Sequence, residues 1–174
     1  MNKKNSILLV VSLLAVSGVA GFFLVRGSAN GLLSPQRERN LPELSLKNYD
    51  GVEVKLSDFR GRPLVVNSWA TWSPFCRDEL RVFVSMQKEF KDAVVIAAID
   101  RAESLSVVKN YTDAQGTTNE LLFLLDPSDS FYESVGGFSM PETVFVDREG
   151  RIKFHKRGPM NADEMRRHME ELIL

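Results

Sequence analysis

The sequence predicts an α/β protein with a mixed central sheet and helices on both faces, and three observations carry this prediction. Strand-like apolar runs alternate with helix-like segments through most of the chain, which is typical of a sheet covered on both faces. Residues 94–99 are continuously apolar, as expected for a strand buried on both sides. Residues 147–150 form a turn sequence between two strand-like runs, which predicts a closing antiparallel hairpin.

The N-terminal segment predicts membrane attachment. Residues 7–25 are almost wholly apolar, and 19 residues at about 1.5 Å each nearly span a hydrocarbon layer of about 30 Å. Lys3 and Lys4 precede the run, so the positive-inside rule places the N-terminus in the cytoplasm. We expect a single-pass anchor over residues 1–26 in the cell (inner) membrane, with the rest extracytoplasmic or periplasmic. The alternative is a cleaved signal peptide, and both interpretations export the domain.

The exported part begins with a linker and a hairpin. Residues 27–40 are rich in small and polar side chains and are interpreted as a linker, which leaves residues 41–174 as the domain. Residues 44–47 and 52–56 alternate in polarity around a Gly-ended turn, so they predict an N-terminal hairpin. The apolar, β-branched run that starts at Leu64 is the first central strand.

The following elements end at turn residues. A strand at 94–99 leads to a weaker helix at 104–114, and a strand at 121–125 leads to a short helix at 130–135. After the closing hairpin, Asn161 is the predicted N-cap of the last helix, which has one apolar face.

Composition excludes several classes of function. The chain has 174 residues, a net charge of −1 and no basic stripe, so we expect no nucleic-acid partner. A single cysteine excludes an internal disulfide and a Cys-rich zinc site. His155 and His168 lie on separate predicted elements without metal-ligand spacing, so neither a metal nor a cofactor is predicted. Composition says nothing about the oligomeric state.

The segment from Trp69 to Cys76 joins the first central strand to a helix that runs to about Phe90. Ser73 is a favoured N-cap residue, and Pro74 suits the first helical position. Cys76 then lies in the first turn, where free N–H groups and the helix dipole favour a thiolate. The apolar spacing turns Cys76 partly inward, and Glu79 is expected on the solvated face.

A second motif surrounds Pro141. It stands at the start of an apolar strand, where a residue without an N–H group is tolerated. Met140 precedes it and Glu142 follows it. Asn67, on the first central strand, is interpreted as a core amide that needs hydrogen-bond partners.

Trp-Ala-Thr-Trp-x-Pro-x-Cys resembles the active-site segment of the membrane-anchored thioredoxin-like reductases of the TlpA and ResA type. Pro-Glu-Thr at Pro141 is similar to the CcmG type, which acts in cytochrome c maturation. The resemblance covers about residues 41–174 and implies a thioredoxin-like fold with a cis peptide bond before Pro141. The family has a cysteine where this chain has Ser73, so the chain retains only the second, resolving cysteine.

The resemblance also implies site residues and partners. It implies that Glu142 tunes the site or contacts a partner; the alternative is a solvent-facing strand residue. Exported protein thiols or apo-cytochrome c are the implied partners, in redox homeostasis or cytochrome c biogenesis. The implied catalytic positions are Cys76 and Ser73, and the implied substrate-binding positions are Trp72, Pro74, Phe75, Met140, Pro141 and Glu142.

Ser73 leaves several hypotheses open, whether it is a natural loss or an engineered replacement. A hydroxyl cannot form a disulfide, so an internal dithiol cycle is excluded. Cys76 could still react with an external resolving thiol, or the domain could be a redox-inactive binding module. A one-cysteine peroxidase is the third hypothesis, although Trp69 stands where peroxiredoxins have a proline. Cys76 could also be a buried, inert thiol.

Overall fold

The computed structural model describes residues 39–174. The predicted anchor and residues 27–38 of the predicted linker lie outside the described residues. Within residues 39–174, no helix is both long and apolar enough to cross a membrane.

The domain is built on one mixed, seven-stranded sheet in the order β2-β1-β5-β4-β3-β6-β7. β3 is parallel to β4, and β4 is parallel to β5, whereas the other neighbours are antiparallel. The predicted hairpins therefore form the two ends of the sheet, β1–β2 and β6–β7. The strands are β1 (Ser45–Asn48), β2 (Glu53–Lys55), β3 (Leu64–Trp69), β4 (Val95–Arg101), β5 (Leu122–Asp126), β6 (Glu142–Val146) and β7 (Ile152–Arg157).

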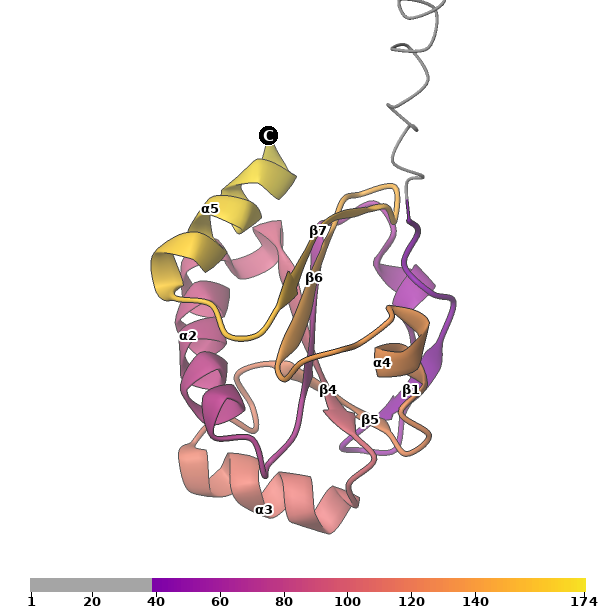
Figure 1. The fold of residues 1–174 in the computed structure, drawn as a ribbon, viewed down its shortest axis with the longest axis vertical. Helices are drawn as coiled ribbons and strands as arrows, with labels where there is room; N and C mark the ends of the chain where they lie inside the picture. Colours follow the sequence, from indigo (N-terminus) through magenta and orange to yellow (C-terminus); the bar gives the residue numbers. More distant parts are fainter. Residues whose placement is uncertain (1–38) are drawn as a thin grey trace, which may run out of the picture. The chain divides into compact units, whose positions relative to one another are not determined.

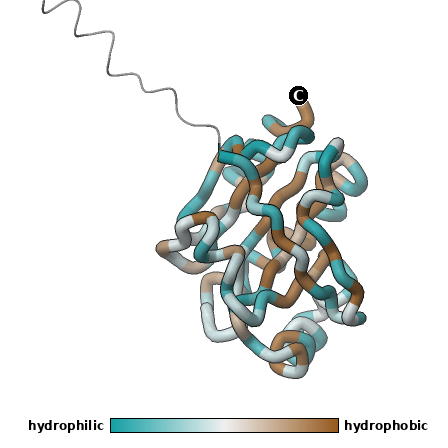
Figure 2. Tube along the Cα trace, turned by 90° about the vertical axis from the view of Figure 1, so that its right-hand side faces the viewer, coloured by the Kyte–Doolittle hydropathy of each residue, from teal (hydrophilic) through white to brown (hydrophobic). Residues whose placement is uncertain are grey.

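Helices cover both faces of this sheet, as predicted (Figure 1). Side chains of α2, α3 and α5 pack on one face, and Phe131 of α4 packs on the other. Figure 2 shows hydrophobic stretches of the chain running through the middle of the domain. The helices are α2 (Pro74–Phe90), α3 (Leu105–Gln115), α4 (Ser130–Ser134) and α5 (Ala162–Ile173), with short 3-10 turns at Leu56–Phe59 and Lys91–Ala93.

The position of β3 between β4 and β6, in the interior of the sheet, explains why its sequence is so apolar. All six of its residues are buried, because helices lie on both sides of it. Leu64 and Val66 enter the core on the α4 side, whereas Val65 enters the core under α2 and α5. Successive side chains of a strand point to opposite faces of the sheet, so β3 contributes apolar residues to both cores. β3 therefore holds the segment after Trp69 on a rigid base.

Candidate functional site

The two sequence motifs meet at one edge of the sheet. Ser68 of β3 pairs with Glu142 of β6 in antiparallel register. The segment that follows β3 and the segment that precedes β6 are therefore neighbours. Met140 packs against the cluster that contains Trp69 and Cys76, and the Met140–Pro141 peptide bond is cis, as the resemblance implied.

Ser73 acts as a helix cap. Its Oγ accepts a hydrogen bond from the Cys76 N–H at 3.4 Å, and Pro74 occupies the first turn. Both of these sequence predictions are confirmed. Serine therefore stabilises the start of α2, because its hydroxyl oxygen accepts a hydrogen bond from one of the free N–H groups of the helix.

Cys76 is covered rather than presented. Its exposed fraction is 1% and that of Ser73 is 3%. Burial raises the pKa of the Cys76 thiol, and hydrogen bonds from Ser73 and the Ala70 backbone offset this only in part. The thiolate expected from the helix N-terminus is therefore not favoured, because desolvation of the charged form outweighs the helix dipole.

Apolar rings are exposed on the two segments that meet at this edge. Trp72 is 63% exposed and Phe75 is 60% exposed in the segment after β3. Phe138 is 84% exposed in the loop before β6, and Met140 is half-buried beside it. We call Trp72, Phe75, Phe138 and Met140 the edge patch. Sequence analysis missed Phe138; its only local signal was a large apolar residue between Gly137 and Ser139 in a turn sequence.

Glu79 is buried, so its placement on the solvated face of α2 was wrong. Its exposed fraction is 3%. Oε2 accepts a hydrogen bond from Asn67 Nδ2 at 3.0 Å, and Oε1 accepts one from the Met160 N–H at 2.9 Å. Asn67 also donates to Thr143 Oγ1 at 3.0 Å, which confirms that it is a satisfied core amide. Burial raises the pKa of Glu79 to about 7 against the lowering effect of these donors.

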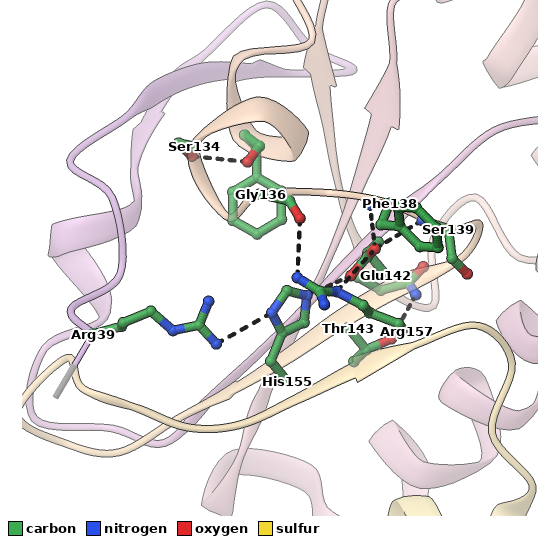
Figure 3. Close-up of polar contacts among 11 residues, drawn as sticks. Arg39, Ser134, Gly136, Phe138, Ser139, Glu142, Thr143, His155 and Arg157 are labelled. Carbon is green, nitrogen blue, oxygen red and sulfur yellow. Dashed lines mark hydrogen bonds and ion pairs between the residues drawn. The ribbon is translucent and has the colours of Figure 1, made fainter. Parts of the chain in front are cut away.

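Glu142 is buried as well, so the solvent-facing alternative was wrong. Its Oε1 accepts hydrogen bonds from the N–H groups of Phe138 at 2.7 Å and Ser139 at 2.9 Å. Its Oε2 contacts Nε2 of His155 on β7 (Figure 3). The carboxyl group therefore holds the backbone of the loop that carries Phe138, and both of its oxygens are engaged within the domain.

Two further carboxyl groups, those of Glu103 and Asp100, support the segment that follows β3. Glu103 accepts hydrogen bonds from the Thr71 N–H at 2.7 Å and from the Thr71 hydroxyl at 2.6 Å. Asp100, at the end of β4, accepts a hydrogen bond from the Glu103 N–H at 3.1 Å, and its Oδ2 has no protein partner. Burial and the neighbouring Glu103 carboxyl raise the pKa of Asp100 to about 8. The sequence analysis identified neither acid as part of this edge.

No group of three or more His, Cys, Asp or Glu side chains within residues 39–174 is arranged to hold a metal ion.

Comparison with known proteins identifies a family and relatives of this chain. The Redoxin family model matches residues 36–173. The chain is 24% identical over 174 residues to the thiol-disulfide oxidoreductase ResA of Bacillus cereus, covering 98% of each chain. It is 26% identical to the thioredoxin-like protein YneN of Bacillus subtilis, covering 92% of this chain and 94% of the relative.

Solved structures share the fold. A putative thiol:disulfide interchange protein DsbE from Chlorobium tepidum aligns with a TM-score of 0.73 and 23% identity, over 81% of this chain and 100% of the other. The pneumococcal exposed lipoprotein thioredoxin from Streptococcus pneumoniae aligns with a TM-score of 0.68 and 27% identity, over 75% of this chain and 100% of the other. The thioredoxin-like fold is confirmed.

Proposed function

This chain belongs to the Redoxin family, and from that premise we propose that it is an exported thioredoxin-fold protein that binds a client polypeptide without an internal dithiol cycle. One contrast carries the proposal. The single cysteine is 1% exposed, whereas Trp72, Phe75 and Phe138 at the same edge are each at least 60% exposed. A nucleophilic thiol needs access, whereas an apolar docking surface needs exposed rings.

The motif contains one cysteine, Cys76, and this supports the loss of the dithiol cycle. Relatives of this chain are named thiol-disulfide oxidoreductases. In this chain Ser73 supplies a hydroxyl that caps α2 through the Cys76 N–H. Oxygen at this position cannot share a disulfide with Cys76, so no two-electron exchange can run inside the motif.

The two reactive hypotheses require a reagent to reach the Cys76 sulfur. An external thiol or a peroxide would have to pass the side chains that bury it, and the raised pKa keeps the thiol protonated. Both features argue against an externally resolved thiol and against a one-cysteine peroxidase. The binding hypothesis needs neither access to sulfur nor a thiolate.

The proposed client is an exported polypeptide with reduced thiols, of which haem-free cytochrome c is an example. The edge patch would contact its apolar side chains, with the exposed Pro74 beside it, whereas Pro141 is buried and its carbonyl already accepts the Gly158 N–H at 2.8 Å. Glu142 would support this surface from below, through the loop that it holds. The catalytic roles implied for Ser73 and Cys76 become a capping role and a packing role.

We place the protein at the membrane through residues 1–26, with residues 27–40 as linker and 41–174 as the extracytoplasmic domain. The apolar run and the preceding lysines support this. A similar solved thioredoxin is described as an exposed lipoprotein. Retention of the full-length chain in carbonate-washed membranes, together with protease digestion of the domain from the outside, would support the placement; release by carbonate would contradict it.

Binding to haem-free cytochrome c tests the docking function. We expect Trp72→Ala and Phe75→Ala each to weaken binding by about tenfold, since central aromatic anchors contribute about 1–2 kcal/mol or more to an interface. Val52→Ala is the control, because Val52 is 57% exposed but lies in the loop before β2. Equal affinities for all the variants and the unmodified chain would contradict the proposal.

Reduction of insulin by dithiothreitol tests the loss of the dithiol cycle. We expect the chain to show no turnover above background, because Ser73 replaces the attacking sulfur. Turnover comparable to that of a dithiol relative would refute this. A strong gain in Ser73→Cys would show that the missing thiol alone accounts for the loss, and no gain would indicate that the edge is remodelled for binding.

A further inference from the structure

His155 of β7 lies between two charged partners from distant parts of the chain. Its Nε2 contacts Glu142 Oε2 at the start of β6. Its Nδ1 lies 3.4 Å from Arg39 Nη2, in the segment that leads into the domain. The His155 side chain is only 5% exposed and that of Glu142 is fully buried, whereas the contact with Arg39 lies at the surface. Figure 3 shows Arg39, His155 and Glu142 in one row.

Hydrogen-bond chemistry assigns the form of the imidazole that suits this row. A guanidinium group only donates, so Nδ1 must accept from Arg39, and Nε2–H must donate to Glu142. Only the neutral imidazole does both. Burial lowers the pKa of His155 from 6.5, Glu142 opposes this shift, and the positive charges of Arg39 and Arg157 add to it.

At one end, the row reaches the edge patch. The second oxygen of Glu142 accepts the N–H groups of Phe138 and Ser139. Arg157 Nε lies 3.8 Å from the same oxygen, and its Nη2 donates to the Gly136 carbonyl at 3.2 Å. The exposed Phe138 ring is thus presented on a loop whose backbone is bound to a buried carboxyl group.

At the other end, the row reaches the junction with the linker. The Ile152 N–H donates to the Arg39 carbonyl at 2.7 Å, and Asn40 forms an antiparallel bridge with Arg151. The Leu41 N–H donates to the Gly150 carbonyl at 2.9 Å. We call residues 39–41 the junction segment; it adds to the outer edge of β7.

We propose that His155 is a positioning residue that ties the junction segment to the loop presenting Phe138, by accepting a hydrogen bond from Arg39 and donating one to Glu142. The inference rests on the proposed function only in assigning a client to that loop. Protonation of His155 makes Nδ1 a donor that faces the donors and positive charge of Arg39. The Arg39 contact is then lost, whereas the contact with Glu142 becomes an ion pair. The junction segment loosens at acid pH, and the loop stays held.

Amide-resolved hydrogen exchange on the full-length chain measures the junction segment and the Phe138 loop separately. The Ile152 amide reports on the junction segment, and the Phe138 and Ser139 amides report on Glu142. Between pH 7.5 and pH 4.5 we expect the protection factor of Ile152 to fall by about fivefold or more, with changes below about twofold at the other two amides. Protection factors, rather than rates, remove the intrinsic pH dependence of exchange.

Variants of His155 separate the hydrogen bonds from the titration. His155→Gln retains one acceptor and one donor but does not titrate, so we expect wild-type protection of the loop and no pH response at Ile152. His155→Leu removes both bonds, and the loop amides should lose protection by about fivefold or more at pH 7.5. His168→Leu is the matched control, because His168 stacks on Phe154 and pairs with Glu171 instead.

The proposal is overturned if His155→Gln loses loop protection as His155→Leu does, or if Ile152 protection in the unmodified chain is independent of pH. Arg39→Ala keeps the test available if His155→Leu fails to fold: it should lower Ile152 protection and abolish its pH response. Binding to haem-free cytochrome c is measured in parallel. The expected exchange pattern without binding refutes the proposed function alone, and binding without that pattern refutes the role of His155 alone.

Discussion

Replacing Glu79 by glutamine should stabilise the fold above neutral pH. Glu79 lies on the buried face of α2, and its pKa is raised from 4.5 to about 7 chiefly by burial. The folded chain therefore holds this proton more tightly than the unfolded chain does. The stability that this carboxyl group contributes is fully present below pH 4.5 and is lost as the pH rises through about 7.

The size of the effect follows from the two pKa values. Each pKa unit is worth about 1.4 kcal/mol, so the difference between 4.5 and about 7 corresponds to about 3 kcal/mol once the group is ionised. A glutamine amide carries no charge and can still accept from the Met160 N–H. The NH2 group of the glutamine needs an acceptor, so the Asn67 amide must turn its oxygen toward this group. Incomplete rearrangement of Asn67 would cost about 1 kcal/mol. We therefore expect a gain of about 2 kcal/mol at pH 8 and, because Glu79 is protonated at pH 4, either no change or a loss of up to about 1 kcal/mol there.

Urea unfolding of both chains at pH 4, 6 and 8 measures this difference directly. Asp100, whose pKa is also raised, contributes a pH dependence of the same sign, but it is common to both chains and cancels in the comparison. Glu170→Gln, at an exposed position on α5, controls for the loss of one negative charge. The reasoning fails if the stability difference between Glu79→Gln and the unmodified chain stays constant from pH 4 to pH 8.

Two further predictions concern the same edge of the sheet. Alkylation of Cys76 by iodoacetamide at pH 7.5 should be about tenfold or more slower in the folded than in the urea-unfolded chain, because burial shields the thiol and raises its pKa; equal rates would contradict the binding hypothesis. Glu103→Ala should lower the free energy of unfolding by about 1–2 kcal/mol, because the N–H and hydroxyl groups of Thr71 lose their acceptor. Urea titration against the exposed control Glu133→Ala checks this, and equal losses in the two variants would exclude a specific role for Glu103.

Features that depend on neighbours in the chain were readable from the sequence. Ser73 caps α2 and Pro74 starts it because N-cap chemistry acts within one helical turn. The strand at Pro141 and the mixed sheet followed from apolar runs and turn residues, which act locally as well. The absence of a second cysteine is a covalent fact that no fold can alter.

Only the tertiary structure decided which polar groups are buried and which apolar groups are exposed. Cys76 stands at a helix N-terminus, yet burial among Trp69, Leu80 and Ala98 raises its pKa, and that burial comes from β3 and β4 as well as α2. Glu79 is hydrogen-bonded to Met160, 81 residues away, and His155 meets Arg39 across 116 residues. Desolvation and long-range partners depend on how distant segments pack, so no local pattern could have assigned these residues their environments.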